Sequence, residues 1–393
     1  MFFTFIIFLI TLSVLVLVHE LGHFLAAKKM GIKVEEFGFG LPPRIWGKRK
    51  GETVYSINWL LIGGFVKLYG EEREEERIKD QRSKIKDINR AFYARPVWQR
   101  SIVLMAGVIM NFLLGIFIIS FLFTQGVMVP TDRVHIEKVL IDTPAEQVGL
   151  KEGDVIKKFK VHLRPELRSR ASSKFKMGKP QDTPEAAQRD SSSVEEVEIK
   201  KGEQLTKITK EHLGEKVILV IVREGKEQEV AIVPRKEYPK DQGPMGIVIS
   251  NFEERKYSIW QAPILGTKEA LILSFELLKG IGRTLFKLIT LQPVAKDVAG
   301  PIGIAQMTGQ AVKFGKLAVL ELLGLLSLNL AIVNILPFPA LDGGRLMFVL
   351  IEGATGKKIR ATWERYLHQI GMAILLSLMA LVAINDIIRI FSK

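Results

Sequence analysis

The sequence predicts an α-helical polytopic membrane protein with four spans, a membrane-associated β-hairpin and one extracytoplasmic α+β domain. Its 393 residues are 48% hydrophobic and 25% charged, which indicates that apolar and polar residues are segregated into membrane segments and polar domains. Four apolar runs are long enough to cross a bilayer core about 30 Å thick. They cover Phe2–Ala27, Ile102–Phe123, Leu317–Leu336 and Leu367–Ile388.

The charge distribution favours a lipid bilayer over a nucleic acid as the partner of this basic chain. The formal net charge is +14, but Lys and Arg cluster beside the apolar runs, as in membrane proteins whose basic loops set their orientation. The sequence contains no nucleic-acid-binding motif. It also contains no cysteine, so disulfides and thiolate metal sites are excluded and a transition metal must use His and carboxylate ligands.

The basic residues also predict the orientation of the spans. Lys28, Lys29 and Lys33 follow the first span, and no basic residue precedes it. The positive-inside rule then places both termini and the α+β domain on the extracytoplasmic side. The predicted division is an N-terminal membrane part (1–128), an α+β domain (129–238) with an insertion at about 160–204, a linker with an amphipathic helix (239–316) and a C-terminal membrane part (317–393).

Two histidines and a glutamate lie at the end of the first apolar run. His19 and His23 are four residues apart, so a helix presents both rings on one face, and Glu20 lies beside the first. This is the H-E-x-x-H pattern of zinc peptidases, in which the glutamate is the general base. The alternative is a helix-end histidine pair with a surface glutamate. Ionisable groups within a span cost roughly 2.5–3.5 kcal/mol each on insertion scales, which favours the metal site.

A second polar motif follows the third span. Pro337 and Pro339 end the helix, and Asp342 precedes two glycines. A zinc ion held by two histidines needs a third protein ligand, and Asp342 is the natural candidate. The alternative is an ion pair between Asp342 and Arg345 at the membrane interface.

The loop after the first span has strand and turn character. Thr53–Ile57 alternates like a strand, and Gly63-Gly64-Phe65-Val66 resembles a turn that enters another strand. One interpretation is a small soluble sheet that packs on itself. The other is a β-hairpin that dips beside the metal helix and holds an extended peptide along a free edge, with Gly63, Gly64, Phe65 and Val66 as substrate-binding residues. The charged run Glu71–Arg90 is interpreted as a solvated helix or loop.

The polar domain resembles a PDZ domain in its order of short strands and helices. The most similar stretch is Gly149–Asp154, and the long Ser-, Lys- and Glu-rich interval at about 160–204 departs from that fold. The charges of Leu265–Leu291 share about a third of the helix circumference, so this helix is expected on the membrane surface or packed on the outer domain. Asn111 in the second span is interpreted as an interhelical contact, with substrate contact as the alternative.

With these motifs in this order, the chain resembles the site-2 protease family of intramembrane zinc metalloproteases, in particular the bacterial regulator-of-sigma-E protease branch. The matching stretches are His19–His23, Phe37–Gly40, Gly63–Leu68, Gly149–Asp154, Gly300–Gly303 and Asn334–Gly344. The resemblance implies Zn²⁺ held by His19, His23 and Asp342, Glu20 as general base, and Asn334 in contact with the substrate backbone. Two features depart from the family: Val108 stands where a proline is frequent, and one PDZ-like unit is visible where that branch often has two.

The resemblance implies a bacterial inner-membrane enzyme that hydrolyses peptide bonds in transmembrane segments. Its expected substrates are transmembrane proteins, for example an anti-sigma factor after a first cleavage, or signal-peptide remnants. A membrane-anchored PDZ scaffold with an inactive metal site is the main alternative. A metal-ion transporter is a second alternative.

Overall fold

The computed structural model describes residues 2–71, 88–162, 194–239, 242–290, 300–357 and 360–391. The chain divides into two compact units. The first combines residues 1–125 with 257–393, and the second covers residues 126–256. Most of the interval predicted as an insertion, residues 163–193, lies outside the described residues, as does most of the charged run, residues 72–87.

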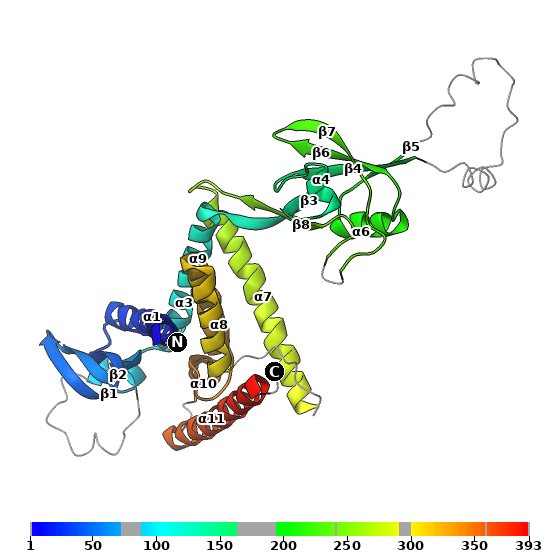
Figure 1. Ribbon diagram of the computed structural model, residues 1–393. Coiled ribbons are helices and arrows are strands. Elements are labelled where there is room, and N and C mark those ends of the chain that lie inside the picture. Colours follow the sequence, from blue (N-terminus) through cyan, green and yellow to red (C-terminus); the bar gives the residue numbers. More distant parts are fainter. Residues whose placement is uncertain are drawn as a thin grey trace, which may run out of the picture. The chain divides into compact units, whose positions relative to one another are not determined.

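The four predicted spans are confirmed as helices in the described part of the chain (Figure 1). They are α1 (Phe2–Lys29), α3 (Val97–Gln125), α9 (Lys316–Ile335) and α11 (Ala361–Phe391). Each contains a segment long and apolar enough to cross a membrane. The protein is therefore a multi-pass membrane protein with β-structure in both of its units.

Small residues allow the spans to approach closely. A Cβ on Gly22 of α1 would lie 2.3 Å from the carbonyl oxygen of Ala106 in α3, and a Cβ on Gly115 of α3 would lie 2.5 Å from Leu328 of α9. Ser327 Oγ donates a 2.7 Å hydrogen bond to the backbone carbonyl of Asn111. Close backbone approach and interhelical hydrogen bonds are the usual basis of helix association in lipid.

The loop between the first two spans forms a long hairpin of β1 (Val34–Lys50) and β2 (Thr53–Leu68), followed by a 3₁₀ turn, η2 (Phe92–Ala94). Phe37 pairs with both Val66 and Tyr55, so the start of β1 lies between the two halves of β2. Among the described residues, the end of β2 is consequently an edge of this sheet. The far part of the hairpin exposes large apolar side chains: Leu41, Ile45, Trp46, Ile57, Trp59 and Leu60.

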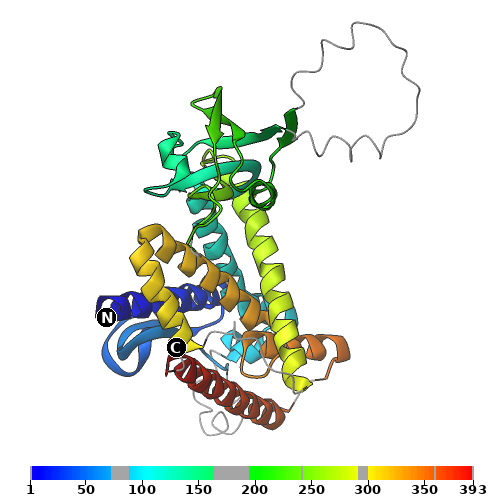
Figure 2. The same ribbon diagram turned by 45° about the vertical axis from the view of Figure 1, so that its right-hand side comes forward.

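The described part of this unit contains three further helices: α7 (Ala262–Ile289), α8 (Pro301–Phe314) and α10 (Asp342–Thr355). The predicted amphipathic helix α7 packs on the spans α3 and α9 through Ala270, Leu273 and Leu277, and not on the outer domain as one expectation had it; its position at the membrane surface stays a prediction. Figures 1 and 2 show α7 running beside α3. A face of small and apolar residues at helical spacing explains this packing, and the charges occupy the other side.

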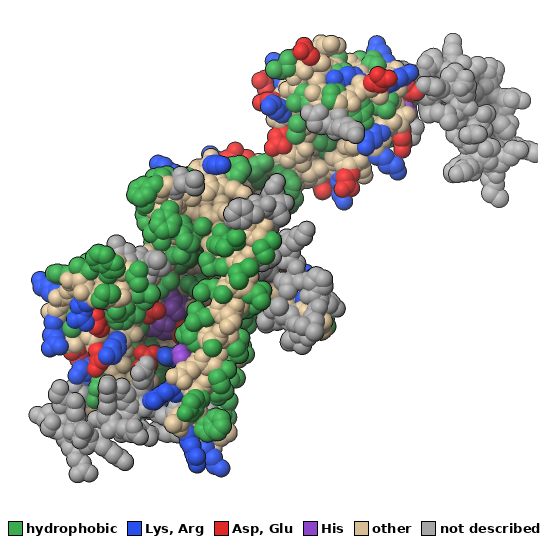
Figure 3. All heavy atoms as spheres, turned by 60° about the horizontal axis from the view of Figure 1, so that its bottom comes forward, with side chains coloured by type: hydrophobic (Ala, Val, Ile, Leu, Met, Phe, Trp, Pro, Cys, Tyr) green, Lys and Arg blue, Asp and Glu red, His purple; other side chains and the backbone are tan. Residues whose placement is uncertain are grey.

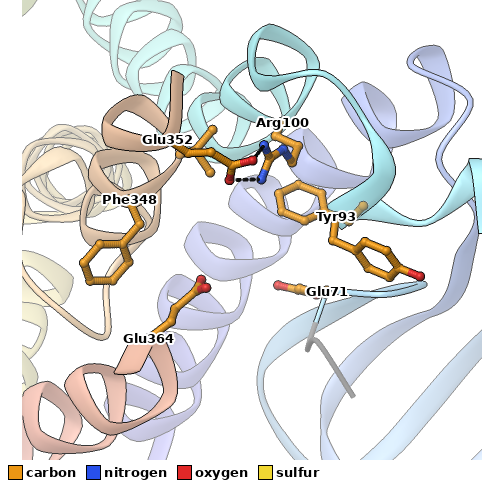
Figure 4. Close-up of a pocket in the computed structure, with 8 residues that line it drawn as sticks. Glu71, Tyr93, Arg100, Phe348, Glu352 and Glu364 are labelled. Carbon is orange, nitrogen blue, oxygen red and sulfur yellow. Dashed lines mark hydrogen bonds and ion pairs between the residues drawn. The ribbon is translucent and has the colours of Figure 1, made fainter. Parts of the chain in front are cut away.

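Ion pairs hold α10 in place (Figure 4). Arg100 of α3 is 4% exposed, and its Nη1 and Nη2 lie 2.9 and 2.8 Å from the carboxylate oxygens of Glu352. Arg345 pairs with Glu71, which follows β2. Both pairs adjoin a small cavity of about 30 Å³, which Glu71, Arg100, Glu352 and Glu364 help to line.

In its described residues, the second unit contains a six-stranded antiparallel sheet and two helices. Its elements are β3 (Val127–Val139), α4 (Pro144–Gln147), β4 (Val155–His162), β5 (Val194–Glu198), α6 (Gly202–Glu211), β6 (Val217–Arg223), β7 (Lys226–Ile232) and β8 (Ile247–Arg255). The strand order is β7-β6-β4-β3-β8, and β5 also pairs with β4. Phe159, Leu205 and Leu219 lie in its core.

Two strands of this unit correct the predicted boundaries. β5 lies inside the predicted insertion and β8 inside the predicted linker, yet both belong to the sheet. β8 pairs with β3 along most of its length, and Ile199, which follows β5, is 2% exposed. Neither strand is recognisable from its own pattern, because β5 is mostly acidic and β8 carries polar residues at many positions.

Asp154 is a buried charge that stabilises the second unit. It is 1% exposed and accepts hydrogen bonds from Arg223 at 2.6 and 2.7 Å and from the Lys151 N–H at 2.8 Å. Burial alone would raise the pKa of Asp154, but these hydrogen bonds outweigh it and hold that pKa below its usual range. Its stabilisation is therefore fully present above about pH 4, the unfolded value, and is lost as the pH falls through the folded-state pKa.

We expect Asp154→Asn to destabilise the second unit by about 2–3 kcal/mol at pH 7, because Arg223 loses its charged partner. The measurement is amide hydrogen exchange of β6 in the full chain in detergent. Between pH 5 and pH 3 the wild type should lose more protection than the variant. Glu196→Gln, which removes an exposed pair with Lys158, is the control and should change β6 little. Equal protection of Asp154→Asn and wild type at both pH values contradicts the expectation.

We also expect Glu352→Gln to lower the free energy of unfolding by about 3 kcal/mol, because it leaves Arg100 buried without a counter-charge. At about 2–4 °C per kcal/mol, the Tm in detergent should fall by roughly 10 °C. Glu364→Gln is the matched control, since Glu364 lines the same cavity and makes no ion pair with any described residue. An equal Tm for both variants would show that the Arg100–Glu352 pair does not hold α10.

Candidate metal centre

The first half of the site is set by the period of α1. His19 and His23 are one helical turn apart, and their rings are buried at 6% and 7% exposure. Their centroids lie 4.7 Å apart, and their Nε2 atoms are 3.2 Å apart. One helix therefore brings two nitrogen donors to one point.

The second half of the site is set by the short segment that connects α9 to α10. α9 ends at Ile335, and α10 begins at Asp342. A Cβ on Gly343 would lie 2.2 Å from the carbonyl oxygen of Leu336, and one on Gly344 would lie 2.3 Å from that of Phe338. The two glycines thus let the connecting segment fold tightly onto the start of α10, which directs the Asp342 carboxylate towards α1.

The three side chains meet in a geometry that suits zinc. Asp342 Oδ2 lies 2.9 Å from Nε2 of His19 and 3.2 Å from Nε2 of His23. For tetrahedral zinc with bonds of about 2.0–2.1 Å, neighbouring donor atoms are about 3.3 Å apart. Among the described residues, this is a group of three donors that could hold one ion. The alternative of an Asp342–Arg345 pair is wrong, because Arg345 pairs with Glu71.

The span α3 backs both rings. His23 Nδ1 lies 2.8 Å from the carbonyl oxygen of Val103, and His19 Nδ1 lies 3.4 Å from Nδ2 of Asn111. Both contacts turn Nε2 towards Asp342. Gly107 lies between them, and a Cβ there would lie 2.4 Å from Nε2 of His23 and 2.7 Å from Cε1 of His19. Because glycine has no Cβ, the space beside Nε2 stays open.

The edge of the hairpin reaches Glu20. The Val66 N–H donates a 3.0 Å hydrogen bond to Glu20 Oε2. Gly63 has a φ of +78°, and a Cβ on it would lie 3.2 Å from Val16 of α1. A Cβ on Gly64 would lie 3.9 Å from Cγ of Glu20. The β2 edge therefore runs beside the helix that carries both histidines.

The remaining predicted residues lie in separate places. Phe65 is half-buried within the hairpin, next to Gly38. Asn334 is half-buried in the last turn of α9, and the structure gives its side chain no hydrogen bond to a described residue. The sequence prediction missed Val103 and Gly107. For Gly107 the only available signal was a glycine in the second span. For Val103 there was none, because it contacts His23 through its backbone carbonyl, which does not depend on the residue type.

The surface view agrees with this geometry. Figure 3 shows histidine side chains in a hollow between hydrophobic surfaces, with acidic side chains beside them. Such a hollow offers the convergent polar groups and apolar walls that are typical of catalytic sites. Water and a peptide group are the reactants that a zinc peptidase brings together there.

Comparison with known proteins identifies the family. The model of peptidase family M50 matches residues 7–378. The regulator of sigma-W protease RasP of Bacillus subtilis is 29% identical over 460 aligned positions, which cover 99% of each chain. The zinc metalloprotease RasP of Oceanobacillus iheyensis is 28% identical, also over 99% of each chain.

These matches extend over nearly the whole chain and include both polar motifs. They confirm the predicted resemblance to site-2 proteases and the prediction of zinc as cofactor, and they favour the hydrolase over the scaffold and the transporter. The chain belongs to peptidase family M50 and is a membrane-embedded zinc metalloprotease.

Proposed function

We propose that His19, His23 and Asp342 hold the catalytic zinc and that Glu20 is the general base. The observation that carries this proposal is the meeting of three donor atoms, each within 3.2 Å of the next, from residues as far as 323 positions apart. Glu20 lies on the same helix, next to His19 and half-buried. The substrates are peptide bonds in the transmembrane segments of other proteins.

In this mechanism Glu20 transfers a proton from the attacking water to the leaving amide nitrogen. Zinc, when bound, polarises the scissile carbonyl and lowers the pKa of an attacking water. The Glu20 carboxylate removes a proton from that water and returns it to the leaving amide nitrogen. The Val66 N–H orients this carboxylate, because it donates to one of its two oxygens. The apolar side chains around the hollow limit the access of bulk water.

The β2 edge is proposed to hold the substrate. A helical substrate hides its N–H and C=O groups in internal hydrogen bonds, so it must unwind before its carbonyl can reach the site. An extended segment that adds to the edge at Gly63, Gly64, Phe65 and Val66 replaces those bonds. The contact between Val66 and Glu20 supports this placement. Asn334 is proposed to hold one further backbone group of the substrate.

The exposed apolar far end of the hairpin supports its insertion beside the spans. Trp46 and Trp59 are 53% and 70% exposed, and such side chains are stable in the interfacial region of a bilayer. Together with the positive-inside rule, this exposure supports our proposal that the hairpin lies at the cytoplasmic side of a bacterial inner membrane. Both termini and the second unit, which we propose to be PDZ-like, are then extracytoplasmic.

The relative in Bacillus subtilis is named a regulator of sigma-W protease. By analogy we propose that the substrates of this protein include an anti-sigma factor that another protease has already shortened. In this proposal the PDZ-like unit excludes substrates that still carry a large extracytoplasmic domain.

We expect Glu20→Gln to keep stoichiometric zinc but to cleave a model transmembrane peptide about 10²–10⁴-fold more slowly, because the general base is lost. Metal analysis and peptide cleavage in detergent measure the two quantities. His19→Ala should lose both zinc and cleavage. Glu321→Gln, an exposed carboxylate of α9, should change neither. Cleavage by Glu20→Gln within about tenfold of wild type would refute the assignment of the base.

We expect Gly107→Ala to weaken zinc binding at least tenfold, because the new methyl group would lie 2.4 Å from Nε2 of His23 and must displace the ring. Competition with a chromogenic chelator measures the affinity. Gly280→Ala is the control, since its Cβ would meet open space in α7. Zinc affinity that is unchanged in Gly107→Ala would contradict the proposed position of the ion.

A further inference from the structure

The two proposed histidine ligands differ in how their second ring nitrogen is held. Nδ1 of His23 lies 2.8 Å from a backbone carbonyl, that of Val103. Nδ1 of His19 lies 3.4 Å from Nδ2 of Asn111. Asn111 is completely buried, and its Oδ1 has no hydrogen-bond partner among the described residues. A buried amide oxygen without a donor costs about 1–3 kcal/mol, so it calls for a physical explanation.

We propose that Asn111 is a positioning residue for zinc: its Oδ1 accepts the Nδ1–H of His19 and holds Nε2 towards His23 and Asp342. This inference rests on the proposed ligation of zinc by His19. A neutral imidazole carries one N–H, and a nitrogen that binds a metal must be the other one. When Nε2 is the ligand, Nδ1 carries the hydrogen and needs an acceptor.

A half-turn of the Asn111 side-chain amide supplies that acceptor. The nitrogen and oxygen of an asparagine amide have nearly the same size, and a half-turn of the amide exchanges them. After this rotation Oδ1 occupies the position near Nδ1 of His19, and the unpartnered oxygen gains a donor. The arrangement then matches that of His23, whose Nδ1–H donates to Val103. Partners of this kind orient metal-binding histidines, and their loss typically costs 10–100-fold in metal affinity.

The alternative role, an interhelical bond between α3 and α9, uses a different atom of the same residue. The backbone carbonyl of Asn111 accepts the hydrogen bond from Ser327 Oγ at 2.7 Å. The Asn111 side chain faces His19 of α1 instead. Substitutions can therefore separate the two roles: Asn111→Leu removes the side-chain contact, and Ser327→Ala removes the bond to α9.

The test measures the zinc dissociation constant by chelator competition, with the full chain in detergent, for the wild type and three variants. Asn111→Leu keeps the approximate volume but has no acceptor, and it should bind zinc about 10–100-fold more weakly. Asn111→Asp keeps the acceptor and loses the donor, and it should bind zinc within about threefold of wild type or more tightly. Ser327→Ala should stay within about threefold of wild type while its Tm falls.

Three results would overturn the inference: unchanged affinity in Asn111→Leu, weakened affinity in Asn111→Asp, or an equal loss of zinc in Ser327→Ala. If Asn111→Leu does not fold, Asn111→Asp still decides, because a donor role or a purely structural role predicts loss of zinc. If wild-type protein binds no zinc, the proposed ligand set fails and the inference fails with it. If the wild type and Asn111→Leu bind zinc equally tightly, the positioning role of Asn111 is rejected, while the proposed ligand set of His19, His23 and Asp342 is kept.

Discussion

The structure depends on the meeting of two imidazoles and one carboxylate inside an apolar helix bundle. A carboxylate taken out of water is costly unless other groups satisfy it. Here Asp342 lies within 3.2 Å of both His19 and His23. The same arrangement brings the third span and the loop after it against the first span. The site and the packing of the membrane unit are therefore linked.

Close helix approach makes this arrangement possible. Gly22 allows α1 to lie against the backbone of α3, and Gly107 leaves space beside the histidine rings. In lipid no hydrophobic effect drives helices together, so small residues and hydrogen bonds have a larger part in packing. α3 combines both features, because Val103 and Asn111 each face a ring nitrogen of α1. The second span contributes none of the three proposed ligands, yet it orients two of them.

The hairpin connects the chemistry to the substrate. Its outer strand directs one backbone N–H to Glu20, so the proposed base and the proposed substrate edge are neighbours. A peptide that adds to this edge would lie beside the carboxylate. Unwinding a membrane helix exposes backbone groups that have no water to bond with. An edge beside the metal centre offers replacement bonds at the point where unwinding is needed.

The sequence by itself determined the four spans and the pairing of His19 with His23, because apolar run length and helical period are local properties. Only the tertiary structure decided which partners these residues have. Val103 and Val66 contact the site through a backbone carbonyl and a backbone N–H, so their residue types gave no signal of these contacts. Gly107 acts through its missing Cβ, and a glycine in the second span was its only signal. β5 and β8 became strands because neighbouring strands in the sheet bond to them. The packing of α7 on α3 and α9 was likewise decided by complementary surfaces far apart in the sequence.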